Sequence, residues 1–211
     1  MKKYLLFTLI LSSLFIKAQT LLLVDDFKSG AFTLSETAVF DSKNQSGPYY
    51  QSGFSIMGGT RKVIYSRGPN PYNQKMSTSV LTKLGAFVVS SGYKAMSSIE
   101  ITYGLNSKNQ SNNTHIDLTQ YKNFNIEFDG INHLLNFNIV FFCYPNSAQC
   151  IGGENFSNHD SPFVFTIPIN KLMANPQPTF NPKDVGSFSL LFNAASATWG
   201  GSLAVKRIWF D

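Results

Sequence analysis

Apolar residues recur at every second position along much of the chain, and this alternation restricts the possible folds more than any other feature. It is clearest in four segments, residues 99–103, 124–129, 135–141 and 188–193. In the first of these, Glu100 and Thr102 separate three large apolar side chains. Side chains of a β-strand point alternately to its two faces, so each segment is predicted to be a strand with one face in a core.

Turn-forming residues divide the rest of the chain into further short apolar segments. Strands are predicted at residues 21–27, 32–34, 61–65, 78–81, 86–90, 163–169 and 202–210. Residues 170–174, before Pro176, fit one turn of helix. Charged and aromatic residues each make up 14% of the chain, which excludes a disordered chain and a coiled coil. About a dozen strands without a linker predict one all-β domain over residues 20–211, an antiparallel β-sandwich (jelly-roll) with little helix.

Residues 1–19 have the pattern of a secretory signal peptide. Lys2 and Lys3 precede an apolar run over residues 5–16, and a short polar stretch follows. The run of about 12 residues is shorter than the roughly 20 that a spanning helix needs, so an uncleaved membrane anchor is the less favoured alternative. Cleavage after Gln19 is predicted to give a secreted or periplasmic protein that begins at Thr20 and has no membrane span.

The leader also accounts for much of the positive charge. The whole chain carries 17 Lys+Arg against 12 Asp+Glu, a formal net charge of +5. Lys2, Lys3 and Lys17 lie in the leader, which leaves a mature chain with 14 basic residues and a net charge of +2. No run of Lys and Arg remains, whereas a nucleic-acid interface needs a clustered basic face. We expect a monomer that does not bind nucleic acid.

The two cysteines lie close together in the sequence. Cys143 and Cys150 enclose six residues. In an oxidising compartment a local pair of this kind is expected to form a disulfide, which would hold one loop. A zinc site is not favoured, because His159 would complete only a Cys2His set with an unusual spacing.

The alternation predicts the residue pairing of one hairpin. Folding about residues 130–133 places the apolar residues of 124–128 opposite those of 135–139, and the polar residues opposite one another. The predicted polar row contains Asn125, Glu127 and Asn138. It is either an ordinary wetted sheet face or a ligand groove, since amides and carboxylates hydrogen-bond sugar hydroxyls.

Several aromatic residues lie in segments rich in Gly, Pro and Ser, where a core position is not expected. They are Tyr49, Tyr50, Tyr72 and Trp199. Exposed aromatic rings stack on the faces of sugars, so these four are candidate ligand-binding residues. The alternative for Trp199 is that it caps an edge of the sandwich.

Arg61 is a further candidate for ligand binding. It follows Gly58-Gly59-Thr60 at the start of a predicted strand, from which it can reach a ligand bound at the loops. The alternative is an ion pair with Asp25 or Asp26 near the start of the mature chain. The sequence does not choose between the two.

Four segments in order along the chain carry a resemblance to a known family. They read VDDF at residues 24–27, IDLTQYKNFNI at 116–126, VGSFSL at 185–190 and SLAVKRIWFD at 202–211. This order resembles the galactose-binding-like β-jelly-rolls, which include many carbohydrate-binding modules. The leader is similar to those of exported proteins of Bacteroidetes-type bacteria. The resemblance implies a non-catalytic carbohydrate- or glycan-binding protein whose partner is a polysaccharide.

The resemblance also implies a structural calcium ion near the first and last strands, with no other cofactor required. Asp25, Asp26 and Asp211 are the residues that would supply its oxygen ligands. Lys206-Arg207 departs from the family pattern, which has acidic residues at this place.

Two other functions remain open. The first is a structural or adhesion protein of the cell envelope or matrix with no small ligand. The second is a jelly-roll polysaccharide hydrolase, which would need two carboxylates across a cleft, such as Glu127 and Asp129. No residue is assigned a catalytic role.

Overall fold

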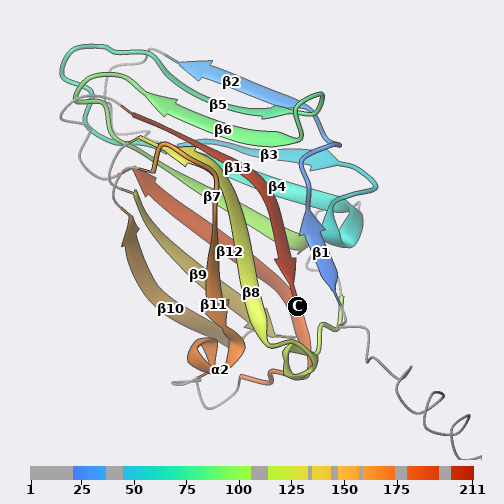
Figure 1. The fold of residues 1–211 in the computed structure, drawn as a ribbon. Coiled ribbons are helices and arrows are strands. Elements are labelled where there is room, and N and C mark those ends of the chain that lie inside the picture. The colour runs from blue at the N-terminus through green and yellow to red at the C-terminus, as the bar shows by residue number, and fades with distance from the viewer. Residues whose placement is uncertain are drawn as a thin grey trace, which may run out of the picture.

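Two antiparallel β-sheets lie face to face and enclose one hydrophobic core in this computed structural model (Figure 1). The structure describes residues 21–36, 45–105, 114–132, 135–143, 147–156, 159–173, 180–194 and 201–211. The predicted all-β sandwich of the jelly-roll type is thereby confirmed. Among the described residues the helical elements are short, and they are η1 (Met57–Gly59), η2 (Leu118–Gln120) and α2 (Ile169–Leu172).

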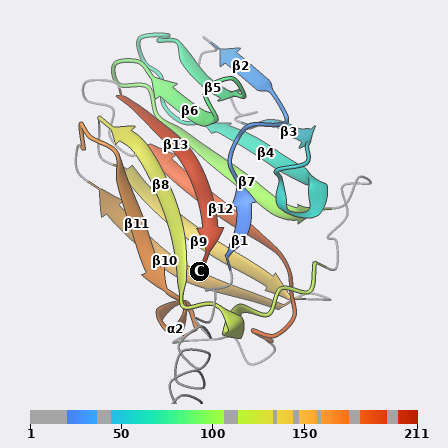
Figure 2. The ribbon, with the colours of Figure 1, turned by 45° about the vertical axis from the view of Figure 1, so that its right-hand side comes forward.

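The two sheets have seven and six strands. Sheet A contains, in spatial order, β11 (Phe163–Pro168), β8 (Asn123–Ile131), β13 (Gly201–Phe210), β6 (Ala86–Ser91), β5 (Met76–Leu81) and β2 (Phe32–Glu36), and β1 (Leu22–Asp25) pairs with β13. Sheet B contains, in spatial order, β10 (Ser147–Phe156), β9 (Leu135–Cys143), β12 (Val185–Ala194), β7 (Ser97–Leu105), β4 (Thr60–Arg67) and β3 (Gln45–Ser52). Figure 2 shows β1 beside β13, close to the C-terminal end.

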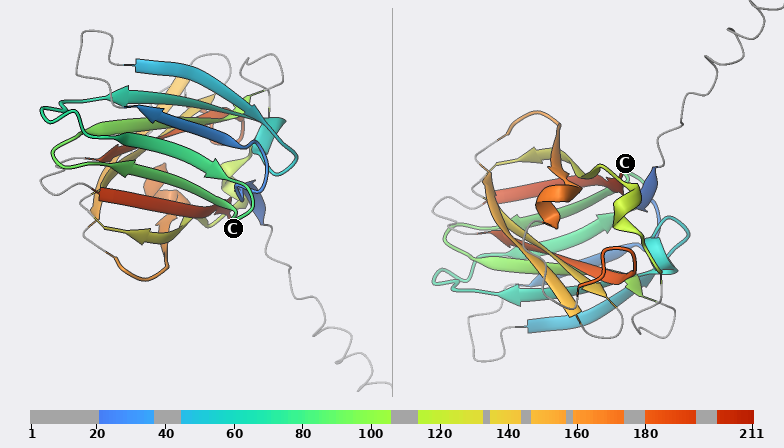
Figure 3. Two further views of the ribbon diagram at one scale, coloured as in Figure 1. Left: turned by 90° about the horizontal axis from the view of Figure 1, so that it is seen from above. Right: turned by 90° about the horizontal axis from the view of Figure 1, so that it is seen from below.

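The chain passes repeatedly from one sheet to the other. It does so between β2 and β3, between β4 and β5, and between β6 and β7. After β7, every connection changes sheet except the one between β9 and β10. The connecting loops therefore collect at the two ends of the sandwich. One end carries α2 and η2, which are in front when the molecule is seen from below (Figure 3). The other end carries the loops that follow β4 and β6.

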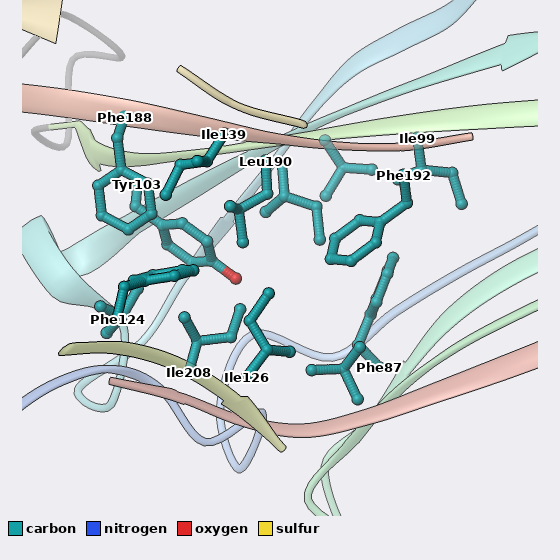
Figure 4. Close-up of a cluster of buried hydrophobic side chains, with 14 of the residues drawn as sticks. Phe87, Ile99, Tyr103, Phe124, Ile126, Ile139, Phe188, Leu190, Phe192 and Ile208 are labelled. Carbon is teal, nitrogen blue, oxygen red and sulfur yellow. The ribbon is translucent and has the colours of Figure 1, made fainter. Parts of the chain in front are cut away.

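The inward rows of the alternating segments form the core. Ile99, Ile101 and Tyr103 of β7 are at most 1% exposed. They face the buried residues of β8 across the sandwich, as the close-up shows (Figure 4). Phe188 of β12 joins the layers, since its ring centroid lies 5.5 Å from that of Tyr103 and 6.0 Å from that of Phe124. Aromatic side chains therefore provide much of the apolar area that this core buries.

The hairpin predicted for residues 124–139 is wrong. β8 pairs with β11 and β13 in sheet A, whereas β9 pairs with β10 and β12 in sheet B. The predicted polar row is therefore divided between two surfaces. Asn125 and Glu127 lie on the outer face of sheet A, and Asn138 lies on the outer face of sheet B.

The alternation does not predict β3 and β10, the two edge strands of sheet B. The pairing of β10 with β9 bears on the predicted disulfide, because it places both cysteines in neighbouring strands. Cys143 pairs with Ser147, and Cys150 pairs with Val140. This register offsets the two cysteines by three positions, about 10 Å at the usual rise per residue. The α-carbons of a disulfide lie within about 7 Å of each other. The strand pairing thus argues against the predicted disulfide, although the side chains of both cysteines lie outside the described residues.

Candidate functional site

Two tyrosines lie side by side on the surface at one end of the sandwich. Tyr72 belongs to the loop between β4 and β5, and Tyr93 to the loop between β6 and β7. They are 52% and 39% exposed, and their ring centroids are 5.3 Å apart with an interplanar angle of 42°. The two loops leave the sheets at the same end (Figure 1). A pair of solvent-exposed rings is therefore accessible to a ligand.

Lys94 holds its ammonium group between the two rings. Its Nζ atom lies 5.5 Å from the ring centroid of Tyr72 and 5.3 Å from that of Tyr93. The nitrogen and the two centroids thus form a nearly equilateral triangle, in which the cation is attracted by the ring faces. The hydroxyl groups of Tyr72 and Tyr93 raise the pKa of Lys94 above its usual value. Lys94 is therefore positively charged at neutral pH.

Hydrogen bonds within and between the two loops fix this cluster. The buried Asn70 side chain accepts a bond from the Gln74 N–H at 2.8 Å and donates one to the Gln74 carbonyl at 2.9 Å. Gly68 donates to the Met96 carbonyl at 2.8 Å, and Met96 donates to the Pro69 carbonyl at 2.9 Å. A loop that is already fixed loses little conformational entropy on binding, which favours its use as a recognition surface.

The local sequence explains why both segments leave the strands as tight turns. The stretch Gly68-Pro69-Asn70-Pro71 contains two prolines, which fix φ and cannot continue a ladder of hydrogen bonds. Asn73 and Lys94 adopt left-handed backbone angles, with φ of +51° and +53°. Asn is common in that region, whereas Lys is not, so Lys94 is held there by the surrounding contacts.

The other predicted aromatic residues lie elsewhere. Tyr49 faces the inside of the sandwich, where its ring centroid is 5.1 Å from that of Phe32. Tyr50 is 43% exposed and points outward from sheet B, opposite Lys62 in the pairing with β4. This opposite orientation follows from their adjacent positions in β3, which the sequence had indicated as a loop. Trp199 lies outside the described residues, so its role stays a prediction.

Arg61 does not contact a ligand in this fold, because it is completely buried. Its guanidinium donates hydrogen bonds to Asp25, to the Gln51 side chain at 3.0 Å and to the carbonyls of Ser29 and Gly30 at 3.2 and 2.7 Å. The ion pair with Asp25, one of the two alternatives raised by the sequence, is the one observed. Arg61 thus ties the segment after β1 to sheet B.

The buried Asp25–Arg61 pair has an unusual electrostatic environment. Burial raises the pKa of Asp25, although Arg61 and the N–H of Phe27 act in the opposite direction. Burial and the nearby Asp25 carboxylate raise the pKa of Tyr103 well above its usual value. These groups face the interior, so their altered pKa values belong to the fold and not to an exposed site.

Asn125 and Glu127, on the outer face of sheet A, each have one polar side-chain partner. Asn125 is 3% exposed, and its Oδ1 atom accepts a hydrogen bond from Thr166 at 2.8 Å, whereas its Nδ2 group has no hydrogen-bond partner among the described residues. Glu127 lies 3.3 Å from Arg207, whose guanidinium is 4.2 Å from the centroid of the Trp209 ring. Arg207 thus lies over Trp209, and the charges in this region neutralise one another. Beside them is a cleft of about 380 Å³, which Glu127 and Arg207 help to line.

The three carboxylates proposed for calcium do not fit a common site. Asp25 is buried against Arg61, and Asp26 lies 3.6 Å from the Lys28 ammonium. Asp211 accepts hydrogen bonds from Asn123 at 2.9 Å and from the Trp209 ring nitrogen at 3.3 Å. Within the described segments, no three acidic, His or Cys side chains converge as they would around a metal ion. Calcium needs six to eight oxygen ligands, which these aspartates do not bring together.

Sequence reasoning found one member of the surface cluster and missed the other two. Tyr72 was predicted from its Gly- and Pro-rich loop. Tyr93 and Lys94 lie in the short connection that follows the strand at 86–90. They are about 20 residues from Tyr72, and no sequence pattern indicates that residues so far apart are in contact. The hydrogen bonds between the two loops bring the rings together.

The fold and this surface define a jelly-roll β-sandwich with an exposed aromatic cluster at one end. Neither a family model nor a curated protein matches the chain. Among solved structures, it is similar to the family 11 carbohydrate-binding module of cellulosomal cellulase Lic26A-Cel5E of Clostridium thermocellum, with 10% identity, a TM-score of 0.42, and coverage of 92% of this chain and 95% of that one.

Two further structures show weaker similarity. One is a non-crystalline cellulose-specific carbohydrate-binding module, CBM28, with 11% identity, a TM-score of 0.39, and coverage of 60% of this chain and 74% of that one. The other is the enzymatically active domain of tailspike protein 4 of bacteriophage CBA120, with 15% identity, a TM-score of 0.39, and coverage of 87% and 20%. Similarity at this level says nothing about a ligand. In the described part of the chain, no helix has the length and apolar character to cross a membrane.

Proposed function

We propose that the protein is a secreted, non-catalytic glycan-binding protein and that Tyr72 and Tyr93 form its sugar-binding surface. The observation that carries this proposal is the pair of exposed rings, 5.3 Å apart, on two loops that hydrogen-bond to each other. The apolar faces of sugar rings stack on aromatic side chains, and two adjacent exposed rings can contact successive residues of one glycan chain.

The cost of binding is also low at this surface. The rings are already exposed, so no part of the core has to rearrange. The Asn70–Gln74 hydrogen bonds keep the loop in one shape, which reduces the entropy lost when a ligand binds. Hydrogen bonds from the tyrosine hydroxyls and from Lys94 are available to sugar hydroxyls.

Two observations support the non-catalytic and exported parts of the proposal. Glu127 and Asp129, the pair considered for a hydrolase, lie near Arg207 and Lys206, at 3.3 and 3.7 Å. They lie on sheet A, whereas the tyrosines belong to loops at the end of the sandwich. Residues 1–19 have the basic, apolar and polar order of a leader, which supports export to the periplasm or the medium.

The proposal is tested by affinity electrophoresis of the purified protein against a panel of polysaccharides. Tyr72→Ala and Tyr93→Ala are each expected to weaken binding of any retarding polysaccharide about tenfold, equivalent to about 1.4 kcal/mol. Both variants are expected to keep their unfolding free energy within about 0.5 kcal/mol, because surface substitutions have small effects. Reducing-sugar release from the bound polysaccharide is expected to be absent.

Tyr50→Ala is the matched control. Tyr50 is exposed to a similar degree, at 43%, but stands on the outer face of sheet B. Its removal is expected to leave binding unchanged. If no polysaccharide retards the protein, or if Tyr72→Ala binds as well as the unaltered protein, the proposed sugar site is refuted and a structural or adhesion role gains support.

A further inference from the structure

The positive charges of the chain are unevenly distributed along the sequence. Residues 42–99 contain seven Lys+Arg and no Asp or Glu. This segment includes β3 to β6 and both loops of the tyrosine cluster. All 12 acidic residues lie outside this segment, and they nearly balance the basic residues of the mature chain. The charged side chains that this segment contributes to the surface are therefore all basic.

Strand pairing brings three of these basic residues to the end of the sandwich that carries the cluster. Arg67 ends β4 opposite Ser97, at the start of β7. Lys75 directly precedes β5, and its carbonyl accepts a hydrogen bond from Gly92 at 3.1 Å. Lys94 lies between the tyrosine rings. One acidic residue also lies at this end, because the pairing of β2 with β5 places the backbone of Glu36 opposite Met76, next to Lys75.

Lys94 itself has no acidic partner among the residues that the structure describes. Its neighbours are the two aromatic rings, and its pKa is set chiefly by them. Two other surface lysines do have acidic partners, in the Lys206–Asp129 and Lys28–Asp26 pairs. An ammonium with three donor hydrogens is thus held beside an exposed stacking surface without an anion of its own.

We infer that the tyrosine cluster binds an anionic sugar, with its carboxylate or sulfate group bonded to Lys94. This inference rests on the proposed function and names the class of its ligand. A sugar stacked on either ring lies at van der Waals distance from the face, and Lys94 Nζ is only 5.3–5.5 Å from both centroids. An acidic group on such a sugar is within reach of a charge-assisted hydrogen bond.

The inference is tested with two probes that share one sugar backbone and differ in charge. Oligogalacturonate carries a carboxylate on each residue, and its methyl ester has the same backbone without the charges. The acidic probe is expected to bind at least about tenfold more tightly than its ester in calorimetry at low salt, which is the lower end of the range for one hydrogen bond to a charged group. That advantage is expected to fall as salt increases. A sulfated oligogalactan and its unsulfated form distinguish sulfate from carboxylate as the preferred group.

Two variants assign the effect to a residue. Lys94→Met is expected to remove the preference, so that the variant binds the acidic probe no more tightly than the methyl ester. Lys83→Met is the control, because Lys83 comes from the same acid-free segment but lies in the turn between β5 and β6, at the opposite end of those strands. Lys83→Met is expected to keep the full preference.

The outcomes separate this inference from the proposed function. Equal binding of each charged probe and its neutral partner, still dependent on Tyr72, overturns the anionic preference and leaves the sugar site intact. Binding of no sugar overturns both. Tighter binding of single-stranded oligothymidylate than of either acidic sugar also overturns the inference, because bases stack on tyrosines and phosphates bind lysines.

Discussion

Replacement of Arg61 by Met is expected to destabilise the fold strongly. Arg61 and Asp25 are both fully buried, and the guanidinium also bonds the Gln51 side chain and two carbonyls of the segment after β1. Removal of one partner leaves a buried carboxylate without its counter-ion, which costs about 3–5 kcal/mol in comparable pairs. The free energy of unfolding, measured by urea denaturation followed by circular dichroism, is expected to fall by that amount at pH 7.

The pH dependence gives this prediction a second, independent readout. Burial already raises the pKa of Asp25, and Arg61 is the main group that opposes the rise. In Arg61→Met, the native state therefore binds a proton more readily than the unfolded state, and its stability increases as the pH falls through the raised pKa of Asp25. The difference from the unaltered protein is expected to be smaller at pH 5 than at pH 7.

A matched control and a double variant complete the test. Lys62→Met removes the neighbouring basic residue of β4, which is half-buried on the outer face, and is expected to change stability by about 0.5 kcal/mol or less. Asp25→Leu combined with Arg61→Met is expected to recover part of the loss, since no unpaired charge remains. A loss below about 1 kcal/mol for Arg61→Met, or no difference between pH 5 and pH 7, would refute the reasoning.

Three further predictions concern other parts of the chain. Gly104 and Gly59 both have φ near +80°, but an added Cβ would lie 2.6 Å from a β12 carbonyl oxygen at Gly104 and in open space at Gly59. The free energy of unfolding, measured in urea, is therefore expected to be about 1–3 kcal/mol lower for Gly104→Ala than for Gly59→Ala, because the backbone strain is shared but only Gly104→Ala adds a clash. Exported protein is expected to begin near Thr20 by N-terminal sequencing, and an intact leader would contradict this. Thiol titration under denaturing, non-reducing conditions is expected to find Cys143 and Cys150 free, whereas the absence of thiols would contradict the observed register.

The period of two was enough to predict the fold class and most strands, because it records which face of each segment is buried. Ile99, Ile101 and Tyr103 are buried where the pattern places them. The same pattern cannot assign a strand to a sheet. In a sandwich, the apolar rows of β8 and β9 face the core whether the two strands pair within one sheet or lie in opposite sheets. Their matching alternation of apolar and polar residues therefore led to a hairpin that the structure does not contain.

The site was less predictable, because it depends on contacts between segments distant in sequence. Tyr72 was identified from its loop, but its neighbours Tyr93 and Lys94 are placed by the hydrogen bonds that join the two loops. Arg61 looked available for a ligand because Gly58 and Gly59 precede it, yet the burial of Asp25 determines its partner. Edge strands such as β3 and β10 lack a clean apolar row, so the alternation did not identify them as strands.

The position of β13 has a consequence for how the protein is made. β13 lies between β6 and β8 and also pairs with β1, so three strands from earlier parts of the chain depend on it for hydrogen bonds. A nascent chain that lacks residues 201–210 leaves each of those strands with an open edge. Sheet A can therefore be completed only after residues 201–210 have been synthesised.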